Sequence, residues 1–240
     1  MMAPKYEKHF IPLESDPAIF SRLIHLLGAP KSLVFEDVLS LDEPHLLPRP
    51  ALALILIFPT TDYDGTPNIA TDLSEDENSL RGSNEDMIWF KQTINNACGL
   101  YGILHALSNS SARDLLDPSS SIAGLIRDCI PLAPQDRALA IEHSYDLEVA
   151  YSSVAKQGGS TVPSNAEDEV DFHYVCFVRS PRNSHLYELD GDRPGPIDTG
   201  VVLGPENDLL TENGVNFVRQ YIEQGKGNAN FGLMALLQKH

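Results

Sequence analysis

The spacing of apolar residues along this chain alternates between two periods, and each period predicts one kind of secondary structure. Apolar side chains three or four residues apart indicate amphipathic helices, whereas alternation at every second residue, or a short continuous apolar run, indicates strands. Helices are therefore expected over residues 16–28, 98–107, 119–129, 133–142, 144–154 and 213–224, and strands over residues 32–37, 51–58, 87–92, 171–179, 184–190 and 231–237. Strands with helices between and around them indicate an α/β or α+β fold.

The most apolar run of the chain covers residues 51–58 and predicts a strand in the middle of a sheet. It is far shorter than the roughly 20 residues that a membrane-spanning helix needs.

Two polar segments interrupt the pattern of apolar residues. Residues 59–85 are expected to form a surface loop that carries no catalytic side chain. Residues 156–169 are rich in glycine, serine and acids, and loops of this length in a compact domain tend to be functional lids or disordered.

A formal net charge of −17 over 240 residues restricts the partners of this chain. Nucleic acids and anionic membrane surfaces require basic patches, so neither is expected as the main partner, and a basic partner suits the charge better. Solubility alone is the alternative explanation of the acidic surplus.

The three cysteines Cys98, Cys129 and Cys176 are an odd number without CxxC spacing. Neither a disulfide framework nor a zinc site is therefore expected, and the histidines show no metal-ligand spacing. We expect no metal and no cofactor. A reducing compartment suits free thiols, namely the cytoplasm, with the nucleus as a second location. The first eight residues contain charges and no apolar segment, so no secretory signal is expected.

Cys98 lies where a polar turn at residues 93–96 gives way to the helical pattern of residues 98–107. Unpaired amides and the positive end of the helix dipole at such a position favour a thiolate, which is the nucleophilic form of cysteine. Gln92 precedes the turn, and its side-chain amide, together with the backbone N–H of Cys98, is a candidate oxyanion hole. The alternative is that Cys98 is simply a small buried hydrophobe.

A predicted hairpin places a histidine beside a carboxylate. If residues 171–179 and 184–190 pair symmetrically about the turn at residues 180–183, His173 lies directly opposite Asp190, and His185 faces Val178. A shift of one residue in this register would separate His173 from Asp190.

Cys98, His173 and Asp190 together supply a nucleophile, a base and an orienting carboxylate, which are the parts of a thiol acyl-transfer triad. Each also has a structural alternative, because a histidine in a sheet can be satisfied by local hydrogen bonds and an aspartate before glycine is a common turn former. His105 follows Cys98 on the same helix, and burial is its expected role, as core packing is for Cys129 and Cys176.

These residues resemble a known family, the ubiquitin carboxyl-terminal hydrolases, which are papain-like cysteine peptidases. Residues 92–99 are similar to the nucleophile signature of that family, residues 171–173 to its histidine strand and residues 185–191 to its aspartate strand. Residues 12–58 and the last strand are similar to the family as well. The resemblance implies a central antiparallel sheet flanked by helices on both sides and a knotted backbone. It further implies a single catalytic domain over residues 1–240, of the short free-standing type, with residues 156–169 crossing over the active site.

The resemblance also implies the reaction. Cys98, His173, Asp190 and Gln92 would hydrolyse the bond after the C-terminal glycine of ubiquitin through a thioester, releasing small adducts or peptides. Ubiquitin, or a close ubiquitin-like modifier, would be the partner of a monomeric enzyme. We expect four acidic residues to help steer the arginine-containing tail of ubiquitin, namely Glu167, Asp168, Glu169 and Asp171.

Two alternatives remain open at this level. Another acyl transferase with the Cys-His-Asp order, such as an arylamine acetyltransferase or a transglutaminase-like protein, would use acyl-CoA or glutamine donors. A ubiquitin-binding module would hold free ubiquitin with little turnover. The presence of Cys98, His173, Asp190 and Gln92 favours turnover.

Overall fold

The computed structural model describes residues 6–60, 87–159, 165–168, 170–224 and 231–239. Its centre is a six-stranded antiparallel sheet with the strand order β2-β8-β3-β5-β6-β7. The strands are β2 (Leu33–Asp37), β3 (Ala51–Pro59), β5 (Phe172–Arg179), β6 (His185–Leu189), β7 (Ile197–Val202) and β8 (Gly232–Gln238). Two short strands, β1 (Lys8–His9) and β4 (Ile94–Asn95), form a separate parallel pair.

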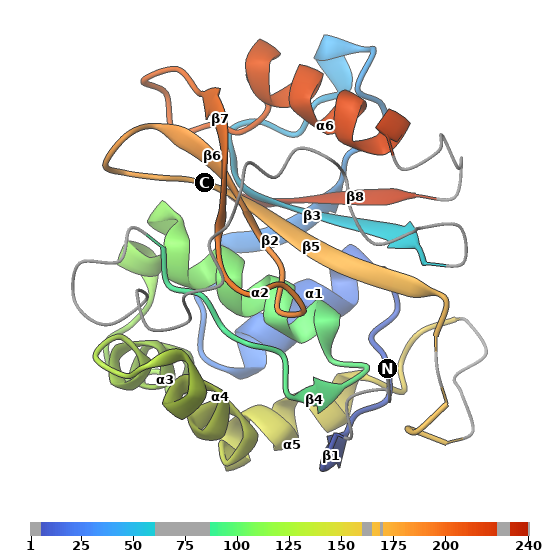
Figure 1. Ribbon diagram of the computed structural model, residues 1–240, viewed down its shortest axis with the longest axis vertical. Helices are drawn as coiled ribbons and strands as arrows, with labels where there is room; N and C mark the ends of the chain where they lie inside the picture. The colour runs from blue at the N-terminus through green and yellow to red at the C-terminus, as the bar shows by residue number, and fades with distance from the viewer. Residues whose placement is uncertain (1–5, 61–86, 160–164, 169, 225–230, 240) are drawn as a thin grey trace.

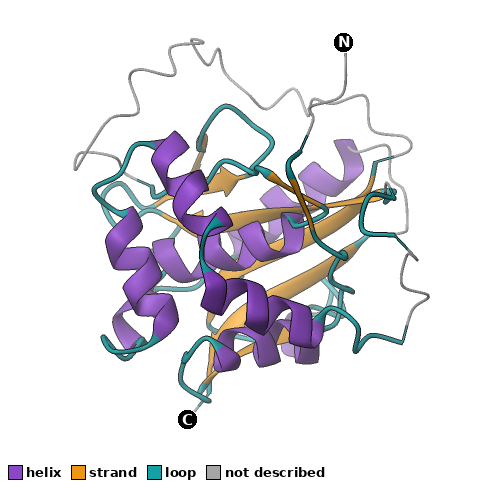
Figure 2. Cartoon of the chain, turned by 90° about the horizontal axis from the view of Figure 1, so that it is seen from below, coloured by secondary structure: helices purple, strands orange, loops and turns teal. Residues whose placement is uncertain are grey.

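Helices cover both faces of the sheet. They are α1 (Pro17–Leu26), α2 (Cys98–Asn109), α3 (Ser121–Cys129), α4 (Pro134–Glu142), α5 (Tyr145–Val154) and α6 (Glu212–Gln224). The first five lie on one side and α6 lies on the other (Figure 1). Seen from below, helices of the larger group lie in front of the strands of the sheet (Figure 2). The predicted mixed fold, with an antiparallel sheet between helices, is confirmed.

The two faces of the sheet belong to two apolar cores. On β5, Cys176 and Val178 pack into the core beneath α1 and α2, whereas Val175 and Phe177 pack into the core beneath α6. Strands that are buried on both faces read as nearly continuous apolar runs, and this explains the composition of residues 51–58. The predicted central position of this strand is correct, because β3 lies between β8 and β5.

Residues at the two ends of α1 define where this predicted helix begins and ends. Asp16 is the N-cap of α1, its Oδ1 accepting a hydrogen bond from the Ala18 amide at 2.7 Å, and Pro17 occupies the first helical position. Gly28, at a φ of +93°, follows the end of the helix. A Cβ at Gly28 would lie 2.6 Å from the Cβ of Ser120, so both the backbone conformation and the available space require glycine.

The prediction of a strand over residues 87–92 is wrong. The backbone groups there bond to side chains instead of a neighbouring strand: the Ile88 amide donates to Asn109 Oδ1 at 2.7 Å, and the Phe90 amide donates to His105 Nε2 at 3.0 Å. The Trp89 carbonyl accepts from the buried Arg137 at 3.2 Å. These side chains lie far along the sequence, so the apolar run alone could not reveal them.

The predicted register of the β5–β6 hairpin is wrong by two residues. The observed pairs include Cys176 with Leu189 and Phe177 with Glu188. A shift by an even number keeps each side chain on the expected face of the sheet. His185 does not face Val178, which pairs with Tyr187; its ring contacts Asp198 instead.

Strands β1, β4 and β7 were not expected from the sequence, and the other predicted helices and strands are present with ends that differ by a few residues. Residues 61–85 of the predicted surface loop lie outside the described residues. None of the helices in the described part of the chain combines the length and the apolar character of a membrane span.

Candidate active site

Cys98 begins α2, as the sequence predicts, and its thiol is almost fully buried. The N-cap residue Ala97 supplies no side-chain acceptor to the first turn. The free amides and the helix dipole therefore favour negative charge at this end of α2. Helix α2 packs against β5 and β3, and a Cβ at Gly99 would lie 3.3 Å from Phe20 of α1, so the start of the helix is enclosed by the core.

His173 and Asp190 meet at the end of the β5–β6 ladder. Their Nε2 and Oδ1 atoms lie 2.9 Å apart, and both side chains are largely buried. The last pair of the ladder is Cys176 with Leu189, so both residues lie just beyond it. The predicted pairing of the two side chains is correct although the register is not, because an error of two residues leaves them on the same face.

Asp190 is held from two further directions. The Trp89 indole donates a hydrogen bond to the Asp190 carbonyl at 2.8 Å, and the Asp192 amide donates to Asp190 Oδ1 at 2.9 Å. These bonds fix the backbone and the carboxylate before any substrate arrives. The carboxylate can therefore orient the imidazole of His173.

Electrostatics favour a protonated His173. Burial by itself would lower its pKa, but hydrogen bonds with Asp190 and with Cys98, and the charges of both groups, hold the pKa well above its usual value. Burial would likewise raise the pKa of Asp190, yet the hydrogen bond and the charge of His173 leave that pKa below its usual range. The structure thus brings the thiol, the imidazole and the carboxylate together as one hydrogen-bonded group.

Gln92 lies against the segment that follows Asp190. The backbone N–H of Gln92 donates to the Gly191 carbonyl at 2.9 Å. The side-chain Oε1 of Gln92 is buried without a hydrogen-bond partner in the described part of the chain. A buried polar atom of this kind is costly unless a ligand or water completes it. The backbone bond holds Gln92 beside the residue that follows Asp190. Its side-chain Nε2, and not the unpaired Oε1, is the candidate donor toward substrate.

The remaining cysteines and His105 behave as core residues, as predicted. Burial raises the pKa of Cys129 to about 11 and raises that of Cys176 further, so both remain thiols. His105 is fully buried and stacks on Phe90, and burial lowers its pKa to about 4. The neutral imidazole of His105 can therefore accept the hydrogen bond from the Phe90 backbone amide.

The chain matches the family described as Ubiquitin carboxyl-terminal hydrolase, family 1 (Peptidase_C12), over residues 10–223. That span is most of the chain and contains all four candidate residues. The chain belongs to this family. Its members are thiol-dependent ubiquitin C-terminal hydrolases, so the chain is a hydrolase of the deubiquitinase class.

Individual relatives agree with this assignment. The chain is 31% identical to ubiquitin carboxyl-terminal hydrolase isozyme L1 of Equus caballus and 32% identical to that of Monodelphis domestica. Each comparison covers 229 residues, 94% of this chain and 96% of the relative. Among solved structures, the catalytic domain of Trichinella spiralis UCH37 bound to ubiquitin vinyl methyl ester is 26% identical. Its TM-score is 0.69, and 98% of each chain is covered.

Asn96 is a site residue that the sequence argument missed within its polar turn. It has a positive φ of 58°, and its Nδ2 donates to the carbonyls of Ala166 and Asp168 at 3.0 and 2.8 Å. The hydrolase therefore ties the loop after α5 to the residue two places before Cys98. Asparagine adopts this left-handed conformation more readily than most residues, and that preference was the available signal.

One of the four acidic residues expected to contact substrate, Asp168, takes part in this tether through its carbonyl. Glu167, Asp168 and Asp171 are exposed, and Glu169 lies outside the described residues. Among the described residues, Glu167, Asp168 and Asp171 form no hydrogen bond or ion pair with Cys98, His173 or Asp190, although Asn96 binds the carbonyl of Asp168.

Asp192 is a second carboxylate beside His173 that the sequence argument did not single out. Its Oδ2 lies 3.9 Å from His173 Nδ1, and its side chain is half exposed. Donor atoms of His173, Asp190 and Asp192 all lie within 4.8 Å of one another, so this is the set of described residues able to hold a metal ion. The sequence-based expectation of no metal remains an expectation.

The change Gly191→Ala is expected to reduce kcat/KM for ubiquitin adducts by about tenfold to a hundredfold. A Cβ there would lie 2.8 Å from Gln92 Cβ and 3.0 Å from the Gln92 amide nitrogen, so Gln92 or Asp190 must move. The measurement is steady-state hydrolysis of a fluorogenic ubiquitin substrate. Gly204→Ala, which meets no atom within 4 Å, is the matched control. Equal rates for the two variants would contradict the tight placement of Gln92.

Glu188 gives the hydrolase a pH-dependent stability. Burial raises its pKa to about 7, opposed by Arg193, whose Nε lies 3.7 Å away. Because the pKa of Glu188 is higher in the folded protein than the 4.5 of an unfolded glutamate, the folded state holds the proton more tightly. The stabilisation from this proton is fully present below pH 4.5, and it is lost as the pH rises through about 7. Relative to Glu188→Gln, the wild-type free energy of unfolding should fall by about 3 kcal/mol across that window.

Urea denaturation of both proteins at the two ends of the window measures this difference. The exposed residue Glu223 on α6 supplies the control, because Glu223→Gln should leave the pH dependence of unfolding as it is. A pH-independent difference between Glu188→Gln and wild type would show that Glu188 ionises normally.

Proposed function

We propose that this hydrolase uses Cys98 as the nucleophile, His173 as the base and acid, Asp190 as the orienting carboxylate and Gln92 as an oxyanion donor. The observation that carries the proposal is the hydrogen-bonded group of Cys98, His173 and Asp190 at the start of a buried helix. The substrate is ubiquitin bearing a small adduct or peptide on its C-terminal glycine.

The reaction follows from this arrangement. The Cys98 thiolate attacks the carbonyl carbon of the last glycine, and the oxyanion is stabilised by the Cys98 amide and the Gln92 side chain. The His173 imidazolium gives its proton to the departing amine as the carbon–nitrogen bond breaks, leaving a thioester. Neutral His173 then takes a proton from water, whose oxygen attacks the thioester. Collapse releases the ubiquitin carboxylate and restores the thiolate and the imidazolium.

The loop over residues 156–169 limits the leaving group in this proposal. It crosses above the start of α2 within a knotted, single catalytic domain, so only small or unfolded adducts pass beneath it. The bonds of Asn96 to Ala166 and Asp168 support this position. Glu167, Asp168, Glu169 and Asp171 then offer negative charge to the arginines of the ubiquitin tail.

Ubiquitin as the partner is supported by two solved relatives, forms of Trichinella spiralis UCH37 that hold ubiquitin vinyl methyl ester. The enzyme acts as a monomer without cofactor, metal or nucleic acid, and a close ubiquitin-like modifier is a second candidate partner. A thiol nucleophile fits the reducing cytoplasm and nucleus.

The deciding experiment is release of a fluorophore from the C-terminus of ubiquitin, compared with release from a short unrelated peptide that carries the same fluorophore. Rapid release from ubiquitin alone is expected. Binding of ubiquitin without release would identify a ubiquitin-holding module instead. Turnover of acyl-CoA or glutamine donors in place of ubiquitin would identify a different acyl transferase.

A further inference from the structure

A cavity lies at the far end of α2 from Cys98. Its volume is about 520 Å³, and it is bordered by the C-terminal residues of α2, by α4 and by the β5–β6 turn. At 1.5 Å per residue, the length of α2 separates it from Cys98 by about 16 Å. The cavity is therefore distinct from the proposed catalytic group.

The cavity is basic in a chain that is strongly acidic. Arg113, Arg137, Arg179 and Arg182 line it, whereas Asp114 is the single carboxylate among its described lining residues. The whole chain carries a formal charge of −17. Arginines gathered at one cavity of such a protein produce a local field that attracts anions.

Arg179 at the end of β5 is the key residue of this cavity. Its Nη2 donates to Ser184 Oγ at 2.6 Å, but its Nε is buried without an acceptor, and it forms no ion pair within the described residues. Arg179 as a whole is half-buried, but an N–H group of a guanidinium that is held away from water without an acceptor is costly. An anionic ligand in the cavity would supply the missing acceptor.

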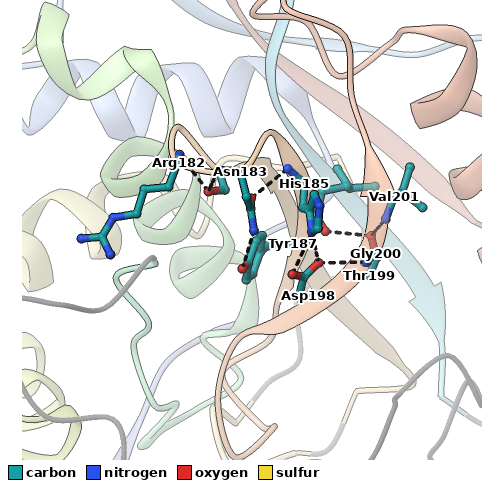
Figure 3. A network of polar contacts seen from close by, with 10 residues as sticks. Arg182, Asn183, His185, Tyr187, Asp198, Thr199, Gly200 and Val201 are labelled. Carbon is teal, nitrogen blue, oxygen red and sulfur yellow. Dashed lines mark hydrogen bonds and ion pairs between the residues drawn. The ribbon is translucent and has the colours of Figure 1, made fainter.

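Arg113 provides a second cation at the same cavity. It is exposed, and its one side-chain hydrogen bond in the described part of the chain is a long one of 3.4 Å from Nη1 to the Ser108 carbonyl. No described carboxylate lies within ion-pair distance of it. Arg182 also borders the cavity, and its side chain extends away from the polar network of the hairpin (Figure 3).

We propose that this cavity binds the phosphoryl group of a small phosphorylated molecule, with Arg113 and Arg179 as its principal ligands. The planar fork of a guanidinium matches phosphate oxygens, and charge-assisted bonds of this kind are stronger than neutral ones. The volume lies within the range of small-molecule sites, so it accommodates more than the phosphoryl group alone. The inference goes beyond the proposed peptidase function and is independent of Cys98.

Isothermal titration of the whole chain with inorganic pyrophosphate, at constant ionic strength, tests the site. Saturable binding is expected, weakened about tenfold by either Arg113→Gln or Arg179→Gln. Arg127→Gln is the matched control, because Arg127 is an exposed arginine on α3 outside the cavity lining. Arg113 is exposed, so its variant keeps the test valid even if Arg179→Gln disturbs folding.

Three results would overturn the proposal: no saturable binding at millimolar pyrophosphate, equal affinity in all three variants, or equally tight binding of citrate, which would mark a carboxylate site. Cys98→Ala should bind pyrophosphate as the wild type does. Loss of peptidase activity and loss of anion binding are thus separate outcomes.

Discussion

Cys98→Ala is expected to abolish hydrolysis of ubiquitin adducts, with kcat/KM falling on the order of 10⁴-fold or more. The change removes the atom that forms the thioester, and nothing nearby replaces it, because Cys129 and Cys176 are buried and stay protonated. The measurement is fluorophore release from ubiquitin under single-turnover and steady-state conditions. Alanine removes only a sulfur atom, so the helix start and the ubiquitin-binding surface should persist.

Cys129→Ala is the matched control for this experiment. Cys129 is fully buried at the end of α3, so its loss creates a small void and lowers the melting temperature, but it should leave kcat/KM unchanged. Titration calorimetry should show that Cys98→Ala still binds ubiquitin. Turnover that survives Cys98→Ala would exclude a thioester at this residue.

Local sequence patterns were sufficient to place Cys98 at the start of a helix. The polar turn before Cys98 and the helical spacing after it both depend on neighbouring residues, and α2 starts where they indicate. The His173–Asp190 pair was also predictable, but for a different reason. Successive side chains of a strand point to opposite faces of the sheet, so a register error of two residues leaves every side chain on its predicted face. The His173–Asp190 pair was therefore preserved.

Contacts between distant segments could not be predicted in the same way. Residues 87–92 have the composition of a strand, yet Asn109, His105 and Arg137 take up their backbone bonds from other parts of the chain. The tether from Asn96 to the loop after α5 spans 70 residues or more. Such pairings depend on tertiary packing, about which periodicity carries no information.

Asp190→Asn is expected to reduce kcat by about 10²- to 10⁴-fold and to change the pH dependence of the remaining activity. The Asp190 carboxylate is a main reason why the pKa of His173 lies well above its usual value. A raised pKa means that the imidazolium persists to higher pH. Removing the negative charge lowers that pKa, so the proton is lost at lower pH and the basic limb of the kcat/KM profile should move down. Hydrolysis measured across the pH range tests this.

The hydrolase contains its own control for this change. His185 and Asp198 form a second histidine–aspartate pair at 2.9 Å, exposed on the hairpin and β7 (Figure 3). Asp198→Asn removes an equivalent charge far less buried than that of Asp190, so both the rate and the basic limb should stay as in the wild type. If Asp190→Asn also left the basic limb in place, another group would have to hold the His173 proton. Asp192, whose Oδ2 lies 3.9 Å from His173 Nδ1, is the carboxylate placed to do so. In that case the double variant Asp190→Asn/Asp192→Asn would shift the basic limb, whereas neither single variant would.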